Sequence, residues 1–202
     1  MKTARQPMNQ FFKTALVAGV GLLMGVCCAS VQAAWDVAQL MQGLAQNKSG
    51  RASFVETKYI AMLDKPVESS GELLFTAPGR LEKRTFKPKP ESVLIENGTL
   101  TVERGKRRHV LRLQDYPELV AFTESIRGTL AGDAAALKRI YTLDLEGSQE
   151  GWTLNLKPVE PKMQELVQRI RIGGSHADVK SIEIEQADKD RSVMVIEKLS
   201  GP

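Results

Sequence analysis

The stretch GELLFTAPGRLEKRTFKP, from Gly71 to Pro88, decides the fold class. In its first half Leu73 and Phe75 alternate with Glu72 and Thr76, which is the period of a half-buried strand. Ala77-Pro78-Gly79 then turns the chain, and the return strand carries five charged residues. The stretch therefore predicts a β-hairpin whose first strand is buried and whose return strand is strongly polar, and it raises the question of what such a sheet encloses.

The same period of two continues on both sides of this hairpin. Before Pro117 the sequence has six strand candidates separated by turn residues, at 52–60, 71–76, 80–86, 92–96, 99–103 and 108–113. Asn97-Gly98 is the firmest of these turns, because a type I′ turn needs positive φ at both central positions. Five more candidates follow, at 141–147, 151–158, 165–172, 179–186 and 191–198. Consecutive hairpins of this kind favour one large curved antiparallel sheet.

Three segments have a helical period instead. Trp35 to Gln46 predicts a short amphipathic helix that Asp36 can cap. Two further helices are predicted between the two groups of strands, at 117–130 and 133–141, and Asp133 can cap the second. The first of these two has an apolar surface formed by Leu119, Val120, Phe122, Ile126 and Leu130. The predicted fold class is therefore mainly β (α+β), with about 11 strands and helices that cover the concave face of the sheet.

The first 33 residues have the pattern of a cleavable secretory signal peptide. A basic region formed by Lys2, Arg5 and Lys13 precedes an apolar run from Ala15 to Val26, which is too short to span a bilayer comfortably. Val31-Gln32-Ala33 has the small-x-small spacing that a signal peptidase accepts. We therefore expect cleavage after Ala33, export to the periplasm and one mature domain at 34–202, with an uncleaved anchor as the alternative.

Both cysteines of the sequence, Cys27 and Cys28, lie in this segment. A lipid-modified Cys27 is a further alternative, although the residues before it fit a lipobox poorly. If the signal peptide is removed, the mature chain has no thiol, so it can form no disulfide and carries no cysteine nucleophile.

Charge argues against nucleic acid as a partner. The sequence has 28 basic and 24 acidic residues, but three of the basic residues and none of the acidic ones lie in the first 33, so the mature chain has a net charge of +1. The basic cluster Arg104, Lys106, Arg107 and Arg108 lies at a predicted hairpin tip. We interpret it as a solvated turn, with a contact to anionic lipid headgroups or to an acidic partner as the alternative.

The mature chain lacks the motifs of common catalytic chemistry. It has no Gly-x-Ser-x-Gly elbow, P-loop or Gly-x-Gly-x-x-Gly segment. Its two histidines, His109 and His176, have no second histidine at ligand spacing and are expected on the surface. Glu183 and Glu185 alternate with isoleucines, as on the wet face of a strand, and a paired acid and base there is the weaker alternative. We therefore expect that the protein is not an enzyme and that it has no catalytic residue, cofactor or bound metal.

Several phrases of the sequence occur in a distinctive order. They are Ala52-Ser53-Phe54, GELLFTAP, Glu91-Ser92-Val93-Leu94, Glu96-Asn97-Gly98-Thr99-Leu100, WTLNLKP and VKSIEIEQADKDRSVMVI. In this order they resemble the LolA family of periplasmic lipoprotein carriers over nearly all of the mature chain. Members of that family fold as an open half-barrel of antiparallel strands with a helical lid. Within that family, the sequence looks more like the LolA-like proteins that accompany fatty-acid or aryl-polyene-type biosynthetic genes than like the general lipoprotein carriers.

The resemblance implies a monomeric carrier that holds an acylated cargo in a hydrophobic cavity, takes it from an inner-membrane donor and gives it to an outer-membrane acceptor. The implied cavity residues are Phe54, Leu73, Phe75, Leu81, Val93, Ile95, Leu154 and Ile182. The implied lid residues are Leu119, Phe122, Ile126 and Leu130. Three of the cavity residues, Leu73, Phe75 and Leu81, are expected to face Ile126 and Leu130 of the lid across a shared cavity. A ligand-free adaptor, related to lipid-sensing regulators that share the half-barrel, is the alternative from another class, and a hydrolase would need a nucleophile that the sequence does not offer.

Two positions depart from the family pattern. Where those carriers have an arginine that holds the lid shut, immediately before the proline of the turn, this sequence has Ala77. Their aromatic residue on the return strand is replaced by Lys83. We therefore expect lid closure to rest mainly on apolar contacts of the helices between Pro117 and Ile140, without a fixed latch.

Overall fold

The computed structural model describes residues 35–199, and the expected signal peptide lies outside these described residues. The predicted mainly β fold is confirmed: one antiparallel sheet has the order β6-β5-β4-β3-β2-β1-β11-β10-β9-β8-β7. Its strands are β1 (Ser49–Tyr59), β2 (Val67–Thr76), β3 (Arg80–Lys87), β4 (Glu91–Glu96), β5 (Thr99–Arg104), β6 (Arg107–Arg112), β7 (Tyr141–Ser148), β8 (Gly151–Pro158), β9 (Val167–Ser175), β10 (Asp178–Gln186) and β11 (Arg191–Lys198).

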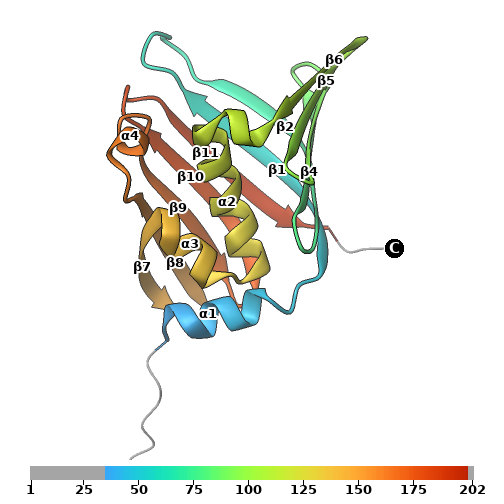
Figure 1. The fold of residues 1–202 in the computed structure, drawn as a ribbon. Helices are drawn as coiled ribbons and strands as arrows, with labels where there is room; N and C mark the ends of the chain where they lie inside the picture. Colours follow the sequence, from blue (N-terminus) through green and yellow to red (C-terminus); the bar gives the residue numbers. More distant parts are fainter. Residues whose placement is uncertain (1–34, 200–202) are drawn as a thin grey trace, which may run out of the picture. The chain divides into compact units, whose positions relative to one another are not determined.

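Helices lie over one face of this open, curved sheet (Figure 1). The three predicted helices are α1 (Val37–Leu44), α2 (Pro117–Ala131) and α3 (Ala134–Ile140). Two short elements had not been predicted, the 3-10 turn η1 (Leu113–Asp115) before α2 and the single turn α4 (Pro161–Gln164) between β8 and β9. The helical segment between β6 and β7 therefore divides the strands into a group of six and a group of five, as the sequence indicated.

The predicted caps and turn residues fix the ends of these elements. The Asp36 carboxylate accepts a hydrogen bond from the Gln39 N–H at 2.9 Å, and the Asp133 carboxylate accepts one from the Ala136 N–H at 2.8 Å. Asn97 and Gly98 have φ values of 51° and 72°, which is the positive φ that their two-residue turn requires. Local sequence chemistry therefore sets these boundaries.

The first strand joins the two groups into one sheet. β1 pairs with β2 on one side and with β11 on the other, so that Phe54 lies between Gly71 and Ile196. β1 is also longer than the pattern predicted, because pairing begins at Ser49. The first and last strands of the domain are thus neighbours, although more than 130 residues separate many of their paired positions.

The main hydrophobic core lies under α1 and α3, over β7 to β10. Its fully or almost fully buried members are Leu40, Met41, Leu44, Leu137, Tyr141, Trp152, Leu154, Leu156, Ile170 and Ile172. They come from α1, α3, β7, β8 and β9, and Ile182 and Ile184 of β10 pack against them. The core therefore stabilises mainly one side of the sheet.

Candidate functional site

All eight predicted sheet residues lie on one face of the sheet. Side chains alternate along a strand, and directly paired residues of antiparallel strands point to the same face. Following the registers from strand to strand places these residues on the face that carries the helices, here called the helix-side face: Phe54, Leu73, Phe75, Leu81, Val93, Ile95, Leu154 and Ile182. Leu154 and Ile182 fix the identity of this face, since both pack in the core with α1 and α3.

Directly paired residues of β2 to β6 form rows of side chains that run across the strands, here called rungs. Two such rungs lie on this face. The apolar rung consists of Phe75, Leu81, Ile95, Leu100 and Leu111. The mixed rung consists of Leu73, Lys83, Val93, Val102 and His109. Sequence reasoning named only the β2 to β4 members, although the alternation in TLTVE at 99–103 already indicated that Leu100 and Val102 share a face. The apolar surface is therefore wider than predicted.

The predicted residues differ in how completely the protein covers them. Leu154 has no exposed surface, Phe54 is 2% exposed and Phe75 is 8% exposed, whereas Leu81 and Val93 are half-buried. Leu73, Ile95 and Ile182 are half-buried as well. Whether these eight residues contact a ligand stays a prediction.

We divide the sheet into two regions by what covers its helix-side face. The closed half is β7 to β10 with α1 and α3, because these helices pack in the core over its apolar face. The open half is β1 to β6.

The expected lid helix α2 presents its large apolar residues half-buried. These residues are Leu119, Phe122, Ile126 and Leu130. Phe122 and Ile126 pack against the core of the closed half, and α2 as a whole contacts α1, α3 and η1. The expected contact of Ile126 and Leu130 with the hairpin residues across a shared cavity stays a prediction.

Small residues, which the sequence reading passed over, form the most buried stripe of α2. Ala121, Ser125 and Thr129 follow one another at intervals of four and are buried. The Tyr141 hydroxyl at the start of β7 donates a hydrogen bond to the Ala121 carbonyl at 2.9 Å. Burial raises the pKa of Tyr141 to about 12, so the hydroxyl remains a donor at any physiological pH. One polar contact thus ties α2 to the closed half, in addition to the expected apolar contacts.

The turn that contains Ala77 lies against α2. A side chain built on Gly79 would meet the Arg127 Cδ at 3.0 Å. The Arg127 guanidinium is paired with Glu124 of its own helix, through an Nε to Oε1 distance of 2.8 Å. Ala77 itself donates only its backbone N–H, to the Lys48 carbonyl at 2.8 Å. The turn therefore lies next to α2 at Gly79, and whether a longer side chain at position 77 would reach the helix stays a prediction.

A buried carboxylate interrupts the apolar helix-side face, and sequence reasoning did not identify it. Glu56 of β1 is 5% exposed and is paired with the ammonium group of Lys83 on β3. The Ser192 hydroxyl donates to Glu56 Oε1 at 2.7 Å, and the Ser69 hydroxyl donates to Oε2 at 3.3 Å. The alternation in SFVET around Glu56 was the available signal, since it places Glu56 on the same face as Phe54.

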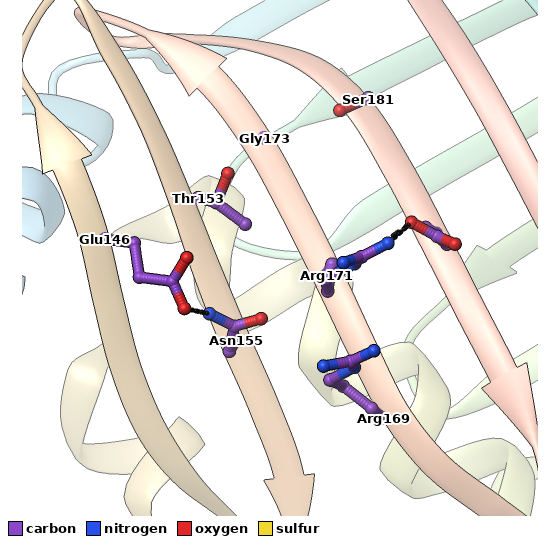
Figure 2. Close-up of a pocket in the computed structure, with 8 residues that line it drawn as sticks. Glu146, Thr153, Asn155, Arg169, Arg171, Gly173 and Ser181 are labelled. Atoms are coloured by element: carbon purple, nitrogen blue, oxygen red, sulfur yellow. Dashed lines mark hydrogen bonds and ion pairs between the residues drawn. The ribbon is translucent and has the colours of Figure 1, made fainter.

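A polar pocket of about 320 Å³ lies on the opposite face of the closed half (Figure 2). It is lined by Glu146, Thr153, Asn155, Arg169, Arg171, Gly173, Ser181 and Glu183. Arg169 pairs with Glu185 at 2.7 Å, and Arg171 pairs with Glu183. The hydrogen bond from Arg169 holds the pKa of Glu185 below its usual range. Glu183 and Glu185 therefore share the face opposite the helices, as their alternation predicted, but both are paired with arginines and their side chains are only 15% and 29% exposed.

Between Trp35 and Leu199, no three histidine or carboxylate side chains are placed to hold a metal ion. In the same part of the chain, no helix has the length and hydropathy needed to cross a bilayer. His109 and His176 are both exposed, as predicted.

The solved structures that match the chain share little sequence with it. A LolA superfamily protein from Nitrosomonas europaea is 10% identical, with a TM-score of 0.45 over 84% of this chain and 96% of that one. A DUF1329 family protein from Desulfovibrio piger is 12% identical, with a TM-score of 0.48 over 83% and 92% of the two chains. A Pseudomonas aeruginosa MucA/MucB complex is 12% identical, with a TM-score of 0.46 over 83% and 59%. No curated protein matches the chain significantly.

One family model matches most of the sequence. The family is described as outer membrane lipoprotein carrier protein LolA-like, and the match covers residues 29–196. The match includes β1 to β10, β11 up to Ile196, the three covering helices and all the site residues described above. The chain therefore belongs to the LolA-like family of outer membrane lipoprotein carrier proteins.

Proposed function

We propose that the protein is a carrier that holds the acyl chains of a lipoprotein or another lipidic cargo against the helix-side face of its open half. The observation that supports this most directly is the apolar rung, whose five side chains from five neighbouring strands share one face. Four of them, all but Phe75, are only half-buried by the protein itself. An apolar surface of this extent, left partly uncovered, is typical of a binding site for an apolar ligand.

Acyl chains match this surface in chemistry and in strength of binding. Each methylene group removed from water contributes roughly 0.8 kcal/mol, so a chain of ordinary length needs to be only partly covered for micromolar binding. The interaction is nondirectional, so the same surface can accept chains of different lengths. No bond is made or broken, and the proposal describes a binding protein rather than an enzyme.

The division of the sheet into two halves suits exchange of the cargo. The closed half keeps its core residues buried whether or not a ligand is present, because α1 and α3 cover them. The helix α2 is held to the closed half by the hydrogen bond from Tyr141. The large apolar side chains of α2 are only half-buried. Movement of α2 would alter access to the open half only after the contacts of Phe122 and Ile126 with the core and the Tyr141 hydrogen bond were broken, while α1 and α3 stayed in place over the core.

The family to which the chain belongs supports the route we propose for the cargo. Its description names outer membrane lipoprotein carriers, and the first 33 residues have the pattern of an export signal. We therefore propose that the mature protein works in the periplasm as a monomer, receiving its cargo from an inner-membrane donor and passing it to an outer-membrane acceptor.

Native mass spectrometry of the protein taken from its own periplasm tests this function. The expected result is a second species heavier by the mass of one or more acylated molecules, which organic extraction removes. Extracted protein should then bind a fluorescent acyl probe. If the protein carries no lipid and the extracted protein binds no acyl probe, the carrier function is wrong and the ligand-free adaptor takes its place.

A further inference from the structure

The cluster around Glu56 places charged groups within an otherwise apolar face. The Lys83 side chain crosses the Phe54 ring, with its ammonium nitrogen 4.8 Å from the ring centroid, and reaches the Glu56 carboxylate. The Lys58 ammonium lies 3.7 Å from the other oxygen of the same carboxylate. Two ammonium groups thus share one carboxylate, and the cluster carries an excess of one positive charge.

The carboxylate is satisfied, whereas the lysine is not. Glu56 accepts hydrogen bonds on both oxygens, from Lys83 and Ser69 on one and from Ser192 on the other. Among residues 35–199, Lys83 makes one hydrogen bond, although an ammonium group has three N–H donors. Its side chain is 28% exposed, against 7% for the Glu56 side chain. Lys83 is therefore the accessible end of the pair, with donors left for another acceptor.

Glu56 holds Lys83 in place at neutral pH. Burial by itself would raise the pKa of Glu56, but the charge and hydrogen bond of Lys83 outweigh it together with Ser192 and Lys58, and the pKa lies below its usual range. The carboxylate is consequently ionised. The lysine is thus fixed on the sheet and does not swing freely into solvent.

Polarity increases along the strands of the open half in a way that would orient an amphiphile. The apolar rung carries no polar side chain. In the mixed rung Lys83 stands between Leu73 and Val93. One rung further along, Thr85 pairs with Glu91. A chain that crosses the apolar rung at Leu81 and runs along β3 would therefore bring its polar end to the level of Lys83.

We propose that Lys83, fixed by Glu56, binds the anionic oxygen group of an acylated guest whose chain lies on the apolar rung. The ligand class is a long-chain amphiphile that ends in a carboxylate or a phosphate. The acyl groups of a lipoprotein are joined through neutral esters and amides, so the proposal narrows the cargo to an anionic lipid. It rests on the proposed carrier function, and it assigns to Lys83 the selection of the headgroup.

Palmitate and cetyl alcohol form a matched pair of probes for this selection, because they share a chain and differ in the charge of the head. Their binding to the lipid-extracted full-length protein is measured at neutral pH by displacement of a fluorescent acyl probe. Both compounds are used at concentrations below those at which they aggregate. The wild type is expected to bind palmitate about tenfold more tightly than the alcohol, as one charge-assisted hydrogen bond provides. Lys83→Met should remove this preference and leave the affinity for the alcohol within about twofold.

Three further variants separate headgroup recognition from net charge and from misfolding. Arg84→Met removes the same charge from the neighbouring position on the opposite face, and it should leave the preference intact. The double variant Glu56→Gln with Lys83→Met removes the buried pair as a unit and should also lose the preference, even if the single variant folds poorly. Lys83→Arg should retain it.

The outcomes distinguish this inference from the function on which it rests. Equal binding of palmitate and cetyl alcohol by the wild type would overturn the role of Lys83 and leave the carrier function standing. An equal loss of preference in Arg84→Met would also overturn it, because net charge would then explain the effect. Binding of neither probe would overturn the carrier function itself.

Discussion

The closed and open halves are built from the same sheet but are stabilised differently. In the closed half, Leu40 of α1 and Leu137 of α3 lie on Leu154 and Ile172, and none of the four is more than 1% exposed. In the open half, Phe54 and Phe75 are buried, but most apolar residues of the same face are only half-buried, and the face carries the ion pair between Glu56 and Lys83. Apolar strand residues therefore do not by themselves make a core, since the covering element decides whether they are structural or available to a ligand.

The largest effect should come from a cavity in the closed half. Leu154→Ala should lower the free energy of unfolding by about 2–5 kcal/mol, because a fully buried leucine loses its contacts and leaves a void. Leu81→Ala is the matched variant in the open half and should cost about 1 kcal/mol in lipid-free protein, since Leu81 is already partly hydrated. Urea unfolding of both variants measures the difference. Equal losses would mean that the two halves are not distinct.

Loss of the buried carboxylate should have the next largest effect. Glu56→Gln should lower the stability at neutral pH by about 1–3 kcal/mol, because Lys83 loses its ionic partner. The folded pKa of Glu56 lies below the ordinary value of 4.5, so its contribution is present above that pH and is lost as pH falls through the folded pKa. Urea unfolding at several pH values should therefore show the variant and the wild type converging in acid.

Glu72→Gln provides the control for this substitution. Glu72 lies on the opposite face of β2 and pairs with Arg51 at 2.7 Å, but the Arg51 side chain is exposed. A surface pair of this kind contributes less than about 1 kcal/mol. A pH dependence as large in Glu72→Gln as in Glu56→Gln would show that burial on the helix-side face is not the cause.

The smallest effect concerns the attachment of α2 to the open half. Ala77→Arg places donors beside α2 and should slow amide hydrogen exchange in residues 117–131 by the equivalent of about 0.5–1.5 kcal/mol. The neighbouring guanidinium of Arg127 keeps the expected gain small. Thr76→Arg, one position earlier and exposed, is the control. Unchanged exchange in folded Ala77→Arg would show that position 77 does not reach the helix.

Most of the fold could be predicted because its strands alternate cleanly and its turns contain distinctive residues. Asn97-Gly98 and the two aspartate caps act locally, so the sequence alone indicates them. The pairing of β1 with β11 depends on contacts between the ends of the domain, which no local pattern records. The short helix α4 has too few residues for a periodic pattern.

The site was harder to predict for the same physical reason. Alternation places Leu81 and Leu154 on equally apolar strand faces, and only the positions of α1 and α3 make the second one core. Glu56 and Lys83 are far apart in the sequence, and each looks like an ordinary surface charge until the register brings them together. The role of a residue that depends on which element covers it can be assigned only from the tertiary structure.

Equilibrium binding of a fluorescent acyl probe to two matched variants tests the central claim most directly. Leu81→Glu places a charge on the apolar rung, whereas Leu74→Glu places it on the opposite face of the adjacent strand, where Leu74 pairs with Glu82. With both variants shown to be folded, the account predicts at least about tenfold weaker binding for Leu81→Glu, equivalent to about 1.4 kcal/mol, and unchanged binding for Leu74→Glu. Equal binding by the two variants would contradict it, because the helix-side face of the open half would then not hold the acyl chain.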